Sequence, residues 1–134
     1  MCPLLDRIDI HIEVASVKYR ELSSEKEEEK SSVIRERVNR ARRMQVERYK
    51  GLKIYSNSQL QPSMMNKFCK LDEKGRELLR NAFEKLGLSA RAHNRILKVA
   101  RTIADMDASE DIKQHHLAEA IQYRSLDRRF WNGN

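Results

Sequence analysis

A single arginine and a stripe of three cationic residues are the parts of this sequence best able to do chemistry. The first is Arg7, which follows Asp6 in the motif LLDRID at the start of an alternating apolar run. An arginine at the edge of a strand presents a planar, permanently charged fork. Such a group can stabilise the charge that develops on a transferring phosphoryl group. The alternative is an ordinary ion pair between Arg7 and either Asp6 or Asp9.

The second group is Arg91, Arg95 and Lys98, in the stretch SARAHNRILKVARTIAD. Their i, i+4, i+7 spacing puts them on one face of a helix, where like charges repel unless an anion or carboxylates neutralise them. Asp105 continues roughly the same stripe, and Glu84 could reach it. The stripe therefore predicts either an anion site or a solvated face.

Other patterns that carry chemistry are absent from the sequence. It has no GxxxxGK[ST] or GxGxxG loop to cradle phosphates, and no HExxH or CxxC pattern to hold a metal. Cys2 and Cys69 lie far apart, so we expect two reduced thiols in a cytoplasmic protein. His115 and His116 are adjacent and would point about 100° apart on a helix, so they are expected not to share a site. We predict no metal site, and no complete enzyme in this chain alone.

The positive charge is concentrated in one segment. The chain has 27 Lys and Arg against 20 Asp and Glu, a formal net charge of +7. From Lys30 to Lys53, nine basic residues are opposed by only two glutamates, which accounts for the whole excess. Because arginines can neutralise phosphates, Arg40, Arg42 and Arg43 are candidate nucleic-acid contacts. The alternative is a charged helix that lies against an acidic face of a core outside this chain.

Composition and periodicity predict a mainly α-helical fold. The 134 residues include only 4 Gly and 2 Pro. Residues 8–14, IDIHIEV, alternate with period two and predict a strand with a buried isoleucine face. No second strand follows, so its sheet must lie outside this chain or in a partner. There is no apolar stretch of about 18 residues and no signal-peptide pattern, so we expect no membrane span and a cytoplasmic location.

The rest of the chain divides into three parts after the N-terminal region 1–20. Residues 21–32 are charged and serine-rich, which is typical of a solvated linker. Residues 33–61 are predicted to be a basic helix and its connection, with Ser31 or Ser32 as the N-cap and Gly51 as the stop.

Residues 62–134 are predicted to form a small four-helix unit. A short helix is expected over 62–69 and a last one over 112–124. Between them, Asp72 caps a helix that ends before Gly87, and Ser89 caps a helix that runs to about Met106. A unit of this size can fold alone, with little stability to spare.

Several segments resemble the C-terminal part of magnesium-chelatase-like AAA+ ATPases, most of all the bacterial YifB/ComM group. They are PLLDRIDIHIEV, VIRERVNRARRMQVERYKG, and LSARAHNRILKVARTIAD with its closing HLAEAIQYRSLDR. The resemblance covers nearly the whole chain. It implies that residues 8–14 are the last strand of a nucleotide-binding α/β core and that the helices after it form the C-terminal lid.

The resemblance also implies functional roles. Arg7 matches the arginine finger, which acts on nucleotide held by the neighbouring subunit. Arg91 matches the sensor-2 arginine, and Arg95 is a weaker candidate for the same site. The family implies a ring, commonly a hexamer, with ATP and Mg²⁺ between subunits. Walker A, Walker B and sensor-1 residues would precede residue 1, so the chain alone is expected to lack ATPase activity.

Three functional hypotheses follow. The first is a lid segment of an ATPase that remodels a substrate, which the resemblance implies to be DNA rather than a metal-insertion complex. The second is a non-enzymatic basic helical module that binds nucleic acid. The third is a helical interaction domain without a nucleotide role.

Overall fold

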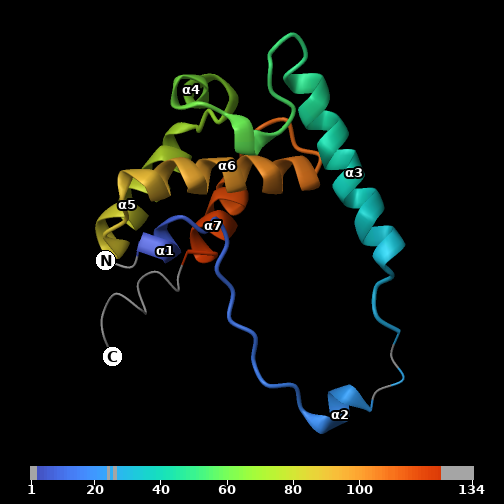
Figure 1. Cartoon of the computed structure of the whole chain (residues 1–134). Helices are drawn as coiled ribbons and strands as arrows, with labels where there is room; N and C mark the ends of the chain where they lie inside the picture. Colours follow the sequence, from blue (N-terminus) through green and yellow to red (C-terminus); the bar gives the residue numbers. More distant parts are fainter. Residues whose placement is uncertain (1–2, 24, 26, 125–134) are drawn as a thin grey trace.

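The computed structural model describes residues 3–23, 25 and 27–124, and this part of the chain is helical (Figure 1). Within it there is no strand, which confirms the mainly α prediction. The helices are α1 (Pro3–Asp6), α2 (Tyr19–Leu22), α3 (Ser31–Arg48), α4 (Met65–Phe68), α5 (Glu73–Leu86), α6 (Ala90–Met106) and α7 (Gln114–Gln122), with 3₁₀ turns η1 (Asn57–Gln59) and η2 (Pro62–Met64).

Local signals place the ends of the central helices. Asp72 accepts a hydrogen bond from the Gly75 amide at 2.7 Å, and the Ser89 hydroxyl accepts one from the Ala92 amide at 3.1 Å. Gly87 ends α5 in the left-handed region, with φ +60°. These side-chain caps satisfy amides that the first turn of a helix leaves without partners. The predicted boundaries of α5 and α6 are thereby confirmed.

The start of α3 differs from the prediction. Its N-cap is Lys30, with no capping side-chain hydrogen bond, and Ser31 is already the first helical residue. Neither Ser31 nor Ser32 is therefore the cap, because the chain turns into the helix one residue earlier than expected. Gly51 has the left-handed backbone expected of a stop residue, with φ +86°, but α3 ends at Arg48 with Tyr49 as its C-cap, so the helix stops earlier than predicted.

Helix α6 is the centre of the bundle. It packs against α7, α3, α4 and η1, while α5 packs against α7. Figure 1 shows α3 standing across one end of α6. The buried stripe of α6 has the predicted helical spacing; the core of the bundle contains Leu60, Met65, Leu79, Ala92, Ile96, Ala100, Ala104, Ile112, Leu117 and Ala120.

A buried polar network joins α3 to α6. Asp105, which is fully buried, forms an ion pair with Arg48 of α3 and another with Arg101 at 3.2 Å. The Asn57 side-chain amide also donates to Asp105 at 2.9 Å. The expectation that Asp105 extends the cationic stripe is wrong, because α3 and η1 cover the C-terminal half of α6. Glu84, which was expected to be able to reach the cationic stripe, lines a separate cavity of about 580 Å³ together with His93.

Residues 8–14 form neither helix nor strand in the structure. Ile8, Ile10, Ile12 and Val14 are exposed, whereas His11 is buried. This is the opposite of the burial predicted from the alternation. No described strand is present to pair with this segment, so the strand itself stays a prediction. Figure 1 shows the chain leaving the bundle here, passing α2 and coming back to the bundle along α3.

Several predictions are confirmed only in part or lie outside the described residues. The last helix is shorter than predicted, and the segment after Arg124 lies outside the described residues, as do Cys2, Ser24 and Lys26. Cys69 is a free, buried thiol whose pKa is raised to about 11 by burial. No helix in the described ranges is long and apolar enough to cross a membrane. The division into 1–20, 21–32, 33–61 and 62–134 stays a prediction.

Candidate functional site

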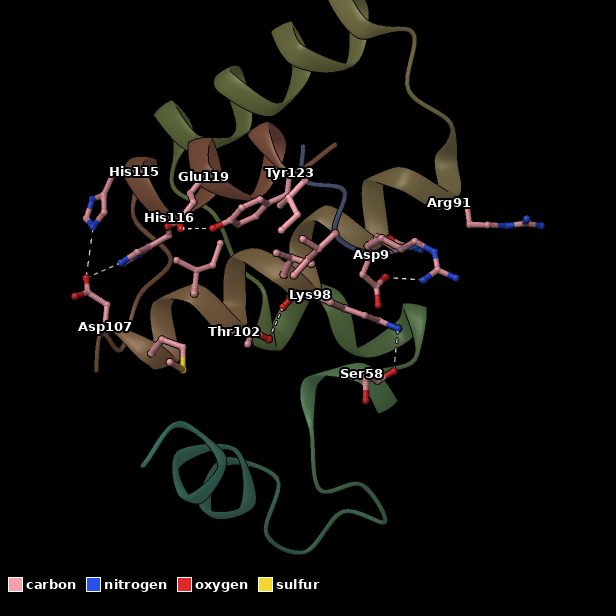
Figure 2. A pocket seen from close by; sticks show the side chains of 17 residues that line it. Asp9, Ser58, Arg91, Lys98, Thr102, Asp107, His115, His116, Glu119 and Tyr123 are labelled. Atoms are coloured by element: carbon pink, nitrogen blue, oxygen red, sulfur yellow. Dashed lines mark hydrogen bonds and ion pairs between the residues drawn. The ribbon is translucent and has the colours of Figure 1, made fainter. Parts of the chain in front are cut away.

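A cleft with a volume of about 1130 Å³ runs along α6. One wall comes from α7 and another from Asp9, Ile10 and Ile12 of the N-terminal segment. Figure 2 shows Arg91 and Lys98 toward one end of this cleft and Asp107, His115 and His116 at the other. The cleft therefore has a cationic end and a histidine end.

The cationic end holds all three residues of the predicted stripe. Arg91, Arg95 and Lys98 line the cleft together. The Arg91 side chain is 56% exposed and, in Figure 2, extends outward. Lys98 donates from Nζ to the Ser58 carbonyl at 3.3 Å. The i, i+4, i+7 spacing thus does bring the three cations to one side of the helix.

Carboxylates from the N-terminal segment neutralise part of this charge. Arg91 Nη1 lies 3.6 Å from Asp6 Oδ2, and Arg95 Nη1 lies 2.6 Å from Asp9 Oδ1. The alternative for Arg7 was an ion pair with Asp6 or Asp9. In the structure these two carboxylates pair with Arg91 and Arg95 instead. The side chain of Arg7 is exposed.

The histidine end corrects an expectation from the sequence. Nε2 of His116 lies 2.8 Å and Nε2 of His115 3.5 Å from Oδ2 of Asp107, and the two rings are 4.0 Å apart. The prediction that the adjacent histidines cannot share a site is wrong. Their Cβ directions differ, but in the first turn of α7 both rings bend toward the residue that follows α6. Hydrogen bonds from His116 first, then His115, lower the pKa of Asp107.

The donor atoms of this cluster do not fit a metal ion. All three lie within 4.8 Å of one another, a spacing that could hold a metal. However, the Lys113 amide donates to Nδ1 of His116 at 3.0 Å. In the neutral ring Nε2 therefore carries the proton and donates it to Asp107, which leaves no lone pair for a metal. Only two ligands remain, so the cluster is a hydrogen-bonded junction between α6 and α7.

The candidate nucleic-acid residues lie on α3, apart from the cleft lining. Arg40 donates to the Met106 carbonyl at 3.3 Å, so it is tied to the bundle. Arg42 and Arg43 are exposed. The structure does not bring these three residues together with the cationic end of the cleft.

Sequence reasoning did not find two contacts around the cationic end. Ser89 donates to Asp6 at 2.6 Å, and the fully buried Arg124 donates to the Ile8 carbonyl at 2.6 Å. A capping serine was visible in the sequence, but its second bond was not. For Arg124, the signal in the sequence was an arginine at a helical position where the periodicity predicts burial, because a buried arginine must find acceptors.

Comparison with known proteins agrees with this architecture. The family model described as magnesium chelatase, subunit ChlI C-terminal, matches residues 28–124. The chain is 42% identical to Competence protein ComM of Haemophilus influenzae over 127 residues, which is 94% of this chain and 24% of that protein. It is 40% identical to the protein YifB of Escherichia coli over the same share of each chain. The chain thus spans about a quarter of these relatives, and it belongs to the magnesium chelatase C-terminal domain family.

Proposed function

We propose that this chain is the C-terminal lid segment of an AAA+ ATPase and supplies two arginines for ATP binding and hydrolysis. Arg91 is the sensor-2 residue and Arg7 the arginine finger that acts on the neighbouring subunit of a hexameric ring. The observation that carries the proposal is the cationic end of the cleft, where Arg91, Arg95 and Lys98 line one open surface.

The state of Arg91 suits a residue that receives phosphate. Its contact with Asp6 is 3.6 Å long, and more than half of the side chain is exposed. The exposed guanidinium and the long contact leave Arg91 accessible, so a polyanion can replace Asp6 as its partner. The Arg95–Asp9 contact is much shorter, at 2.6 Å. Arg95 is therefore the second candidate for the same phosphates.

Arg7 combines a held backbone with an exposed side chain. The carbonyl of Ile8 and the carboxylate of Asp6, on either side of it, are bonded to the bundle. A residue that reaches into a neighbouring subunit needs such an arrangement, since positioning limits the effect of an arginine finger.

The same residues fit phosphate oxygens but not the Mg²⁺ that accompanies ATP, because Mg²⁺ takes oxygen ligands and the site is cationic. We propose that the ligands of Mg²⁺ come from the nucleotide and from a core outside this chain. Bound Mg²⁺ would neutralise charge on the phosphates. The residues of this chain would orient the phosphates and stabilise their developing negative charge.

Following the resemblance to the ComM group, we propose that the ring uses ATP hydrolysis to remodel DNA. One observation favours a DNA contact by this chain. Arg35, Arg42 and Arg43 are exposed on α3, where their helical spacing turns them away from the buried Ala41 and Gln45, and Lys50 is exposed in the turn after the helix. A basic helical module that binds nucleic acid is the second candidate function, and the salt dependence of DNA binding tests it.

The substitution Arg91→Ala in the full-length protein tests the nucleotide role. Loss of a positioned donor to the reacting phosphates predicts that ATP turnover falls by about 10²–10³-fold. Arg80→Ala is the matched control, because Arg80 is an exposed arginine of α5 that lines the other cavity. ATP turnover is measured by phosphate release, and near-normal turnover in Arg91→Ala would rule out the sensor-2 role.

A further inference from the structure

Asp6 connects the segment around Arg7 to the first turn of α6. Its carboxylate accepts a hydrogen bond from the Ser89 hydroxyl at 2.6 Å, across 83 residues of sequence. The same hydroxyl oxygen accepts from the Ala92 amide at 3.1 Å and so caps α6. Ser89 therefore uses its hydroxyl in both directions. One bond fixes the start of the helix, and the other ties that start to Asp6.

The same carboxylate lies beside two guanidinium groups. Arg91 Nη1 is 3.6 Å and Arg124 Nη2 is 3.8 Å from it. The side chain of Arg124 is fully buried, and its Nη1 donates to the carbonyl of Ile8 at 2.6 Å. The chain is therefore anchored immediately before and immediately after Arg7.

His11 closes this anchored segment into a compact turn. Its backbone amide donates to the Tyr123 carbonyl at 2.7 Å. Its Nε2 lies 2.9 Å from the Leu5 carbonyl and 3.1 Å from the Ile8 carbonyl, so that nitrogen carries the proton. The turn that presents Arg7 is thus fixed to α6 through Asp6 and to the end of α7 through His11 and Arg124.

We propose that Asp6 is a positioning residue that couples Arg91 to Arg7. This inference rests on the proposed function, since it concerns the two arginines assigned there. When an anion draws the Arg91 guanidinium away, the carboxylate of Asp6 loses one of its two cationic neighbours. Its hydrogen bond with the Ser89 hydroxyl changes as a result. The segment that carries Arg7 responds because Asp6 directly precedes it. Occupancy of the nucleotide site in one subunit is thereby transmitted to the finger that acts on the next.

Solution NMR on the ¹⁵N-labelled chain, titrated with inorganic tripolyphosphate, tests this coupling. In the unaltered chain, the amide signals of Arg91 and of Arg7 and Ile8 are expected to shift together with one apparent Kd. In Asp6→Asn the shift at Arg91 persists while the shift at Arg7 and Ile8 is lost. The asparagine keeps the size of the side chain and an acceptor for Ser89, so it removes mainly the charge that senses Arg91.

Two further variants make the result decisive. Asp9→Asn removes a negative charge from the same segment but from neither anchor, so the shift at Arg7 should remain. Ser89→Gly removes the 2.6 Å bond to Asp6, while glycine is tolerated at an N-cap with a loss of only a few tenths of a kcal/mol. It should abolish the shift at Arg7 in the same way. If Asp6→Asn does not fold, Ser89→Gly decides.

The outcomes separate the two proposals. A shift at Arg91 without one at Arg7 in the unaltered chain overturns the coupling and leaves the nucleotide role standing. An undiminished shift at Arg7 in both Asp6→Asn and Ser89→Gly does the same, because the signal would then reach Arg7 by another route. The absence of any shift at Arg91 with tripolyphosphate overturns the anion role of Arg91 and, with it, the coupling.

Discussion

The substitution Asp105→Asn tests whether the basic helix α3 is docked on the lid. Asp105 is fully buried, and it pairs with Arg48 from α3 and with Arg101 from its own helix. The alternative from the sequence was a charged helix that lies against an acidic face outside this chain. In that case the charge of Asp105 would matter little to the isolated chain.

The structure gives the size of the expected effect. Asparagine preserves the shape of the side chain but leaves the two arginines without the carboxylate. The side chain of Arg101 is only 5% exposed and that of Arg48 19% exposed, so water can compensate them only in part. Removing one partner of a buried ion pair destabilises a protein by about 3–5 kcal/mol. For a domain of this size, that lowers Tm by at least about 10 °C.

The free energy of unfolding is measured by urea titration, with helicity followed by circular dichroism. Asp111→Asn is the matched control, because Asp111 is an exposed aspartate in the connection between α6 and α7. A double-mutant cycle with Arg48→Met then isolates the contact between the two helices, with an expected coupling of at least about 1 kcal/mol. A loss below about 1 kcal/mol in Asp105→Asn, with no coupling to Arg48, would refute the docking of α3 through this pair.

Three further predictions concern function and pH. Arg7→Ala in the full-length protein is expected to lower ATP turnover by about 10³–10⁵-fold, because an arginine finger acts on the transition state from the neighbouring subunit. ATP affinity, measured by calorimetry, should be retained. A loss of affinity with turnover intact would contradict this. Replacing Arg42 and Arg43 together by alanine should reduce the slope of log affinity for duplex DNA against log salt by roughly two, since each arginine that contacts a phosphate contributes about 0.9; equal slopes would exclude the pair from the contact. Hydrogen bonding to His116 holds the pKa of Asp107 below its ordinary 3.8, so this contact stabilises the fold above that pH and is lost as the pH falls through the lowered value. Unfolding titrations between pH 2 and 6 should therefore show a shallower acid loss of stability in Asp107→Asn than in the unaltered chain, and identical profiles would count against the contact.

The sequence by itself determined most of the local structure. Asp72 and Ser89 mark the starts of α5 and α6 and Gly87 the end of α5, because capping and left-handed stops involve residues within one helical turn of each other. The apolar periodicity of α6 likewise identified its buried face. Spacing also placed Arg91 and Arg95 on one side of α6, where the structure puts them beside the cleft. The family resemblance assigned roles to those positions, which stay predictions.

Only the tertiary structure decided which charges meet. Asp6 contacts Ser89 across 83 residues, and Arg124 donates to Ile8 across 116. No periodic pattern encodes such pairs, since they depend on where the N-terminal segment crosses the bundle. The same holds for Asp105, which the helical spacing put on the solvent stripe and the packing of α3 buried. Caps and periodicity act over a single turn, whereas the partners of buried charges are chosen by how whole elements pack.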